Sequence, residues 1–176
     1  AHGPKVEKNW GRKLNLKERR LARDSALSAT TSVETVSARG HRFSEDIASL
    51  PIVLGNYAEV RDGKTEEFSI ESFNHGSATR KVLAIFNEIG LGADLMRARD
   101  GRNIRAGKAT MRGRVHKTPK SVLLVVKEKS GLAQAARNLP GVDVVAARDL
   151  CAEDLAPGGD VGRLTVFTKD AVEALN

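Results

Sequence analysis

A dense run of cationic side chains in the middle of the sequence is the feature best suited to chemistry. Between Arg97 and Lys120, nine Lys or Arg residues accompany a single acid, Asp100. Three glycines interrupt the run, so its backbone can bend sharply and lie close to a partner. A glycine-rich, charge-dense loop suits a polyanion better than a small substrate. Nucleic-acid binding is therefore the leading hypothesis for residues 97–120.

The first 23 residues form a second basic block, with eight Lys or Arg residues and two acids. Because the whole chain carries a net charge of +7, the residues outside the two blocks must sum to −7. Concentrating positive charge in this way favours a directed electrostatic face, although charge runs can also be plain solvated surface. We expect residues 1–13 to form an extended basic arm and residues 97–120 a basic, glycine-rich RNA-binding loop.

The candidate RNA-binding residues are the cations of both blocks and one histidine. They are Lys5, Lys8, Arg12, Lys13, Lys17, Arg19, Arg20, Arg23, Arg99, Arg102, Arg105, Lys108, Arg112, Arg114, His116, Lys117 and Lys120. Arg side chains can fork onto phosphate oxygens or stack on bases, and Lys side chains act as point charges. His116 can stack on a base or bond a phosphate. Such contacts suit irregular RNA, which is recognised by shape and by splayed bases.

Catalytic and metal chemistry find little support. Residues 158–162 (GGDVG) superficially resemble a dinucleotide fingerprint, but a strand rather than a helix follows them, so we expect a plain turn. The four histidines never stand three or four positions apart, and Glu153-Asp154 have no nucleophile beside them. We therefore expect no catalytic residue, cofactor or metal. An α/β nucleotide- or RNA-modifying enzyme with unrecognised catalytic groups is the alternative, and a partner-binding module is a third possibility.

Cysteine and hydropathy patterns bear on the compartment. Cys151 is the only cysteine, which excludes an intrachain disulfide and favours a reducing compartment; we expect it to be a small buried filler. No apolar run approaches the roughly 18–20 residues that cross a bilayer. The polar, basic N-terminus does not resemble a signal peptide. These patterns predict a cytoplasmic protein without a membrane partner.

Four short apolar runs predict the strands of a single α/β domain over residues 1–176. They are Ile52–Leu54, Val122–Val126, Val142–Ala146 and Leu164–Phe167. Continuous apolar strands that alternate with helices indicate a mostly parallel sheet of about four strands, covered on both faces in a three-layer α/β/α arrangement. Residues 55–76 are polar and read as a loop, with a turn at Asp62-Gly63.

Helices are expected between these strands. Asn15 and Glu18 form an N-cap arrangement close to a capping box, and the helix they open has one small apolar stripe of Leu21, Ala22, Ala26 and Ala29. Ser77 is expected to cap a second helix, whose apolar residues are Val82, Ile85, Phe86 and Ile89 and which ends at Gly90. Shorter helices are predicted over Leu132–Asn138 and Ala171–Leu175, the latter capped by Thr168 or Asp170.

Four blocks of the sequence resemble a known family. NLKERRLARDSALSAT (15–30), AGKATMRGRVHKTPKSVLLVV (106–126), ARNLPGVDVV (136–145) and EDLAPGGDVGRLTVFT (153–168) are together similar to large-subunit ribosomal protein four, in its archaeal form. The resemblance covers most of the chain and is weakest over residues 55–76. It implies a cytoplasmic three-layer domain that binds large-subunit ribosomal RNA early in assembly, near the exit tunnel and beside other ribosomal proteins. It implies no catalysis and no small-molecule substrate.

By position, the resemblance assigns two groups of residues to RNA. Lys13, Lys17, Arg19, Arg20 and Arg23 match the family's basic helix, and Arg105, Lys108, Arg112, Arg114 and Lys117 match its RNA-contacting loop. Ala109-Thr110 and Val115-His116 depart from the family's pattern. Family members also carry a first strand, a helix and a tunnel-reaching extension ahead of the point that matches Ala1. We expect this chain to lack them, so the tunnel role is not assigned to its residues.

Overall fold

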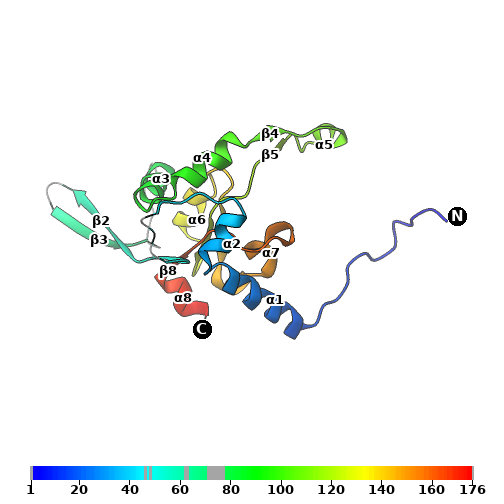
Figure 1. Ribbon diagram of the computed structural model, residues 1–176, viewed down its shortest axis with the longest axis horizontal. Helices are drawn as coiled ribbons and strands as arrows, with labels where there is room; N and C mark the ends of the chain where they lie inside the picture. Colours follow the sequence, from blue (N-terminus) through cyan, green and yellow to red (C-terminus); the bar gives the residue numbers. More distant parts are fainter. Residues whose placement is uncertain (1, 46, 48, 62–63, 71–77, 176) are drawn as a thin grey trace.

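Four parallel strands form the centre of the molecule. The computed structural model describes residues 2–45, 47, 49–61, 64–70 and 78–175 (Figure 1). In spatial order the strands are β1 (Ile52–Leu54), β8 (Thr165–Thr168), β6 (Leu123–Val126) and β7 (Asp143–Ala146). Each neighbouring pair is parallel. The predicted α/β class, with a mostly parallel sheet of about four strands, is confirmed.

Helices cover both faces of this sheet. Because side chains alternate along a strand, Leu124 and Val126 belong to one apolar cluster while Leu123 and Val125 belong to another. The first cluster includes side chains of α3 (Ala78–Glu88), α4 (Gly92–Asp100) and α6 (Gly131–Ala136). The second includes side chains of α1 (Leu16–Ala29), α7 (Ala152–Leu155) and α8 (Lys169–Leu175). The sheet is thus the middle layer of three.

Most helix predictions are confirmed, with small shifts at the ends. In α3, Val82 and Phe86 are buried, and Gly90 follows with φ +89°. The Ala171 N–H donates to the Thr168 hydroxyl (3.3 Å), so Thr168 caps α8. The helix expected over residues 132–138 is α6, which ends earlier, at Ala136. Ser77 lies outside the described residues.

The interpretation of residues 55–76 as a loop is wrong. Residues 56–69 form an antiparallel hairpin of β2 (Asn56–Arg61) and β3 (Lys64–Ser69). The predicted turn at Asp62-Gly63 lies outside the described residues. The sequence carried a hairpin signal, since β-prone residues such as Tyr57 and Phe68 flank an Asp-Gly pair. The many charged residues between them obscured it.

The apolar stripe predicted for α1 is only half correct. Ala26 is buried and Ala29 partly buried, but Leu21 is 72% exposed and Ala22 is exposed as well. The Asn15 N–H does donate to the Glu18 carboxylate (3.3 Å), as the capping arrangement requires. Only the second half of α1 packs on the body, against α7, while its first half leads out toward the N-terminus (Figure 1).

The expectation that Cys151 is a buried filler is also wrong, because the residue is exposed. The thiol donates to the Asp154 carboxylate (3.0 Å), which also accepts from the Cys151 N–H (3.1 Å). Partial burial, together with the thiol's hydrogen bond to Asp154, raises the pKa of Cys151. The residue therefore helps to begin α7, which the apolar-filler interpretation did not foresee.

The remaining elements are short. α2 (Val33–Ala38) places Val36 in the first cluster. A 3-10 turn, η2 (Ala147–Asp149), follows β7, and another, η3 (Pro157–Gly159), lies ahead of β8. The GGDVG sequence is thus the expected turn before a strand. In the described part of the chain, no helix has the length and apolar character that crossing a membrane requires.

Three segments project from this body (Figure 1). The β2–β3 hairpin projects on one side. On the opposite side project residues 2–15, which form no helix or strand, and the segment that follows α4. Both projections on that second side are the basic blocks of the sequence.

The burial of β6 on both of its faces makes a stability prediction. Leu124→Ala is expected to lower the free energy of unfolding by about 2–5 kcal/mol, because Leu124 is fully buried in the sheet's centre. Leu83→Ala on the exposed side of α3 is the matched control and should cost about 1 kcal/mol or less. Urea denaturation followed by circular dichroism measures both, and equal losses would contradict this account of the core.

Candidate nucleic-acid interface

The basic block at 97–120 is more ordered than the loop that its sequence indicates. Its first four residues complete α4. The rest is a hairpin in which β4 (Asn103–Ile104) pairs antiparallel with β5 (His116–Lys117), with α5 (Lys108–Met111) at the tip. We call residues 102–118 the basic hairpin. The Arg105 N–H extends the ladder by donating to the Val115 carbonyl (2.7 Å).

Two glycines shape the tip of the basic hairpin. Gly107 precedes α5 with φ +77°, and Gly113 follows it with φ +79°. L-residues rarely adopt this left-handed region, whereas glycine does so without strain. The chain can therefore enter and leave a one-turn helix within a few residues, and the cations between the two glycines are turned outward.

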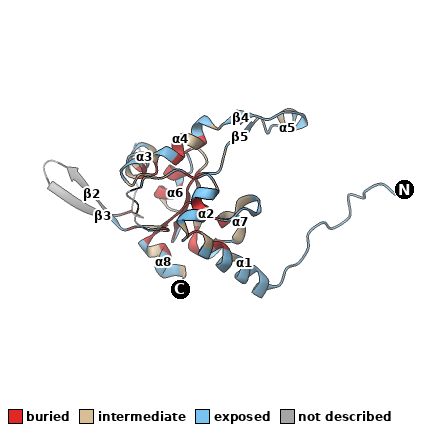
Figure 2. Ribbon diagram, viewed as in Figure 1, coloured by how far each residue is buried: buried red, intermediate tan, exposed pale blue. Residues whose placement is uncertain are grey.

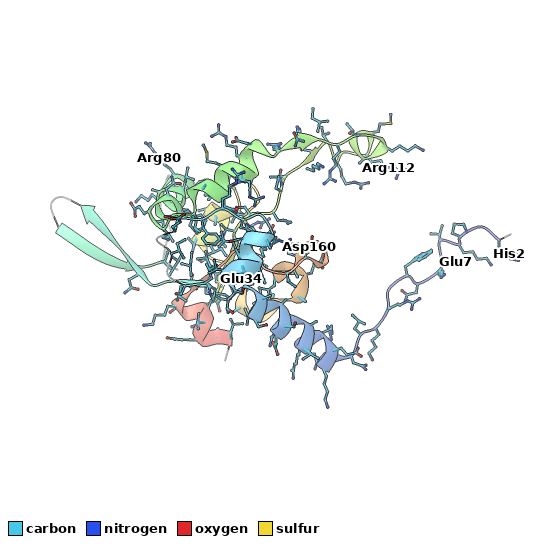
Figure 3. All side chains as sticks on the ribbon, viewed as in Figure 1. His2, Glu7, Glu34, Arg80, Arg112 and Asp160 are labelled. Carbon is cyan, nitrogen blue, oxygen red and sulfur yellow. The ribbon has the colours of Figure 1, made fainter. Side chains whose placement is uncertain are left out.

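Six cations of the basic hairpin are exposed to solvent. They are Arg102, Arg105, Lys108, Arg112, Arg114 and Lys117. Among the described residues, none of these six forms an ion pair; the Arg105 Nε instead donates to the His116 carbonyl (3.1 Å). Figure 2 shows the hairpin almost wholly exposed, and Figure 3 places Arg112 at its far end. Unneutralised charge at this density attracts anions.

The N-terminal cations lie on the arm and on α1. Lys5, Lys8, Arg12 and Lys13 are exposed on the arm, and Lys17, Arg19 and Arg20 are exposed on α1. Arg23 forms an ion pair with the adjacent Asp24 (2.9 Å), and the Lys8 ammonium lies 4.5 Å from the centre of the Trp10 ring. The structure gives no contact between these residues and the basic hairpin, although the two project on the same side of the body (Figure 1).

The base of the hairpin holds the remaining predicted residues differently. Arg99 is exposed on the last turn of α4. His116 is exposed on β5, opposite Ile104. Lys120 forms an ion pair with Asp143 (2.6 Å) and is half exposed. Of the predicted residues, Lys120 is thus the one at the hairpin base that is already paired within the protein.

A buried carboxylate, Asp94, ties the hairpin base to the body. Its side chain is fully buried on α4. It accepts hydrogen bonds from His41 Nδ1 (3.1 Å to each oxygen) and the Arg42 N–H (3.1 Å). It also accepts from Arg97 Nε (2.9 Å) and the Ser121 hydroxyl (2.6 Å). The donors come from the loop after α2, from α4 and from the start of β6.

Arg97 extends this network into the hairpin base. Besides Asp94, its guanidinium donates to the Lys120 carbonyl (2.8 Å). The two ends of the 97–120 block are therefore joined directly. Arg97 is the one cation of the block that the sequence did not single out, and the structure gives it an anchoring position.

The network fixes the charge of Asp94. Burial alone would raise the pKa of this carboxyl, but hydrogen bonds from His41, Arg97 and Ser121 outweigh that effect and lower the pKa well below its ordinary value. Asp94 therefore stays ionised. Because His41 Nδ1 faces a carboxylate, it carries a proton and acts as donor. The buried Nε2 atom of His41 has no hydrogen-bond partner among the described residues.

Arg163 forms a second anchor at the same edge of the sheet. Its buried guanidinium donates to the Ser121 carbonyl (3.0 Å), the Asp154 carbonyl (2.9 Å) and the Asp143 carboxylate (2.6 Å). Burial opposes ionisation of Asp143, but hydrogen bonds from Lys120 and Arg163 still lower its pKa. Ser121 therefore bonds to both Asp94 and Arg163, and Lys120 bonds to both Arg97 and Asp143.

Close backbone packing completes the hairpin base. Gly141, with φ +73°, lies where a Cβ atom would stand 2.3 Å from the Pro119 carbonyl oxygen and 3.0 Å from the Ser121 nitrogen. The Gly141 carbonyl accepts from the Ser121 N–H (2.9 Å). Glycine is needed here both for its conformation and for its lack of a side chain.

The anchoring residues were missed by sequence analysis. The spacing of Asp94 and Arg97 was a signal, since residues three apart on a helix can form an ion pair. The partners His41 and Arg163 gave none, because they lie 53 positions from Asp94 and 42 from Ser121. No group of His, Cys, Asp and Glu side chains within the described residues could hold a metal ion.

The chain is similar to known ribosomal proteins. The model of the ribosomal protein L4/L1 family matches residues 1–176. A protein of Methanocaldococcus jannaschii is 45% identical over 175 residues, and one of Halorubrum lacusprofundi is 44% identical over 173; each is called large ribosomal subunit protein uL4. The matches cover 99% and 98% of this chain but 63% and 62% of those proteins. The chain thus spans less than two thirds of these relatives' length.

The buried network makes a prediction that depends on pH. Asp94→Asn is expected to lower the free energy of unfolding by about 3 kcal/mol or more at pH 7, because Arg97 then loses its buried counter-charge. Since the folded pKa of Asp94 is depressed, its stabilisation is fully present above the ordinary aspartate value of about 4 and is lost as pH falls below it. The difference in the free energy of unfolding between Asp94→Asn and the unsubstituted chain should therefore become smaller as the pH falls from 5 to 3.

The matched control is Asp149→Asn, which removes an exposed carboxylate 3.9 Å from Arg148. It should change stability by about 0.5 kcal/mol or less at either pH. Urea titrations across that pH range measure all three proteins. A loss for Asp94→Asn that stays constant with pH would contradict the assignment of an ionised, network-bound carboxylate.

Proposed function

Because the chain belongs to the ribosomal protein L4/L1 family, we propose that it is a structural component of the large ribosomal subunit that binds ribosomal RNA directly. In this proposal it acts in the cytoplasm beside neighbouring ribosomal proteins, binds early in assembly and helps to fold and stabilise the RNA near the exit tunnel. It needs no cofactor, metal or small-molecule substrate and catalyses no reaction.

The observation that carries the proposal is the anchored basic hairpin. Six cations that form no ion pair with any described residue stand on a segment that projects from the body and is held at its base by Asp94, Arg97 and Arg163. Projection lets the cations enter a fold of RNA that the body itself could not enter. A rigid base lowers the entropy that must be lost on binding.

Phosphate contacts supply most of the affinity in this mechanism. Each phosphate neutralised by Lys or Arg releases condensed counterions, so binding depends steeply on salt. The planar guanidinium groups of Arg112 and Arg114 can bond two phosphate oxygens at once or stack on bases. The exposed cations of the arm and α1 add a second set of contacts on the same side of the body (Figure 1).

One face of the basic hairpin also offers an apolar contact. Because Arg105 and Val115 are joined by a ladder hydrogen bond, the next pair, Ile104 and His116, is of the non-hydrogen-bonded kind, whose side chains lie closest together. Ile104 is 69% exposed, and Met111 at the tip is 88% exposed. Bases that leave the RNA stack can pack on such side chains.

The enzyme alternative receives no specific support from the described residues. The buried polar cluster lies where β6, β7 and β8 begin, whereas ligands of open α/β sheets bind beyond the carboxyl ends of the strands. The Asp94 and Arg163 side chains already have hydrogen-bond partners within the protein, so they are not free to bind a substrate. Both side chains anchor the base of the basic hairpin.

The salt dependence of binding tests the contact directly. Arg112→Ala with Arg114→Ala is expected to weaken binding to a large-subunit RNA fragment and to reduce the slope of log K against log[salt] by about 1.4, the share of two phosphates on single-stranded RNA. Filter binding at several salt concentrations measures the slope.

The control removes two cations elsewhere on the surface. Arg148→Ala with Lys169→Ala lowers the net charge equally, but both residues lie away from the basic hairpin, next to the far ends of β7 and β8. The slope should then stay near that of the unsubstituted chain. Equal slopes for the two double variants would refute the hairpin as the RNA contact.

Met111 separates apolar from ionic contributions. Met111→Ala is expected to weaken RNA binding roughly three- to tenfold with no change in salt slope, because the side chain gives up apolar contact and no charge. Met96→Ala, on the exposed side of α4, is the matched control and should leave affinity unchanged. A salt slope altered by Met111→Ala would mean that the tip had changed its fold.

A further inference from the structure

The sheet has an open edge at β7. Among the described residues, β7 pairs with β6 alone and ends the order β1-β8-β6-β7. The Asp143 N–H donates to the Val122 carbonyl (3.2 Å), so Asp143 turns its backbone groups toward β6. Successive residues of a strand turn these groups to opposite sides. Val144 and Ala146 therefore direct their N–H groups away from the sheet.

A groove runs along this edge. Its floor is β7, and its residues include Lys129, Arg137 and Glu153 as well as Val144. Lys129 precedes α6 and Arg137 follows it, in the layer on one face of the sheet. Glu153 belongs to α7, in the layer on the other face. The groove thus has a cationic wall and an acidic wall.

We propose that the β7 groove binds an extended segment of another polypeptide, which adds a fifth strand to the sheet. The outward N–H and carbonyl groups of Val144 and the outward N–H of Ala146 supply the hydrogen bonds, as in other strand additions. Because side chains alternate along an added strand, one set faces Lys129 and Arg137 while the next faces Glu153. The partner segment is therefore one in which acidic and basic residues alternate.

RNA fits this groove less well than a peptide. Glu153 is exposed on one wall, so a phosphate backbone there would meet negative charge. The Lys120 and Arg163 cations that also line the groove are already paired with Asp143. Phosphates also have no N–H groups to give to the outward backbone carbonyl of Val144. None of the basic hairpin residues 102–118 lines the groove, although Lys120 at the hairpin base does, so the proposal concerns a surface next to the basic hairpin and is tested separately from it.

The test uses the full chain and three capped nonapeptides built on Thr and Val. At their charged positions, the first peptide has Glu and Lys in alternation, the second has only Glu, and the third has only Lys. The alternating peptide is expected to bind most tightly in a calorimetric or NMR titration. Val144→Pro should weaken its binding at least about fivefold, because proline removes the outward N–H and leaves the ladder to β6 intact.

The other edge of the sheet provides the matched control. The register of β1 with β8 leaves Val53 with its N–H directed outward, so Val53→Pro makes the same change at the opposite edge. It should leave peptide binding unchanged. If Val144→Pro fails to fold, amide hydrogen exchange of the unsubstituted chain decides instead. The Val144 and Ala146 amides should then slow at least about fivefold with the peptide, while the Val53 amide does not.

Three outcomes overturn the proposal. One is no binding of any peptide, and another is equal loss in the two proline variants. The third concerns Lys129→Glu with Arg137→Glu, which is expected to abolish the preference for the alternating peptide over the Lys-only peptide. An unchanged preference in this double variant overturns the proposal. If that variant instead weakens binding of an RNA fragment while peptides do not bind, the groove is an RNA contact. Failure here leaves the hairpin's salt dependence untouched, so the two proposals fail separately.

Discussion

The ionised carboxylate of Asp94 is the constraint on which the arrangement of the basic hairpin depends. A charge buried this deeply is tolerated only when every lone pair has a donor. The donors come from the loop at His41 and Arg42, from Arg97 on α4 and from Ser121 at the start of β6. A shift of any one of these segments would remove a hydrogen bond from the buried charge. The hairpin therefore leaves the body in a defined direction.

The fixed base explains how one small domain separates its charges. Two acids near the hairpin base, Asp94 and Asp143, are engaged with the cations Arg97, Lys120 and Arg163. They do not reach the cations farther along the hairpin. The positive charge beyond the base is thus left for a partner, while the two carboxylates at the base are neutralised by cations of the body. The net charge of +7 understates the field that a polyanion meets on this side.

The core could be predicted from sequence, because burial leaves a local signal. Val122–Val126 is continuously apolar, and β6 is buried on both faces as that pattern requires. The charge of the 97–120 block was equally plain, but its form was not. Two-residue strands such as β4 and β5 are too short for a period to appear, so the segment reads as a loop. The partners of Asp94 were out of reach of local reasoning, because tertiary packing brings them together. Leu21 shows the opposite failure, since an apolar residue at a helical spacing points to solvent when the helix extends past the body.

The two open edges of the sheet differ in a way that bears on association. β1 has three residues and begins directly after Pro51, so it offers little edge for pairing. β7 is longer, and its protection is the charged groove. If two copies of the chain paired antiparallel through β7, the same face of each sheet would lie on the same side. Lys129 and Arg137 of one copy would then meet those of the other, and like charges across a strand pair are destabilising. The groove walls that favour a strand of alternating charge therefore also oppose antiparallel pairing of two copies of the chain through β7.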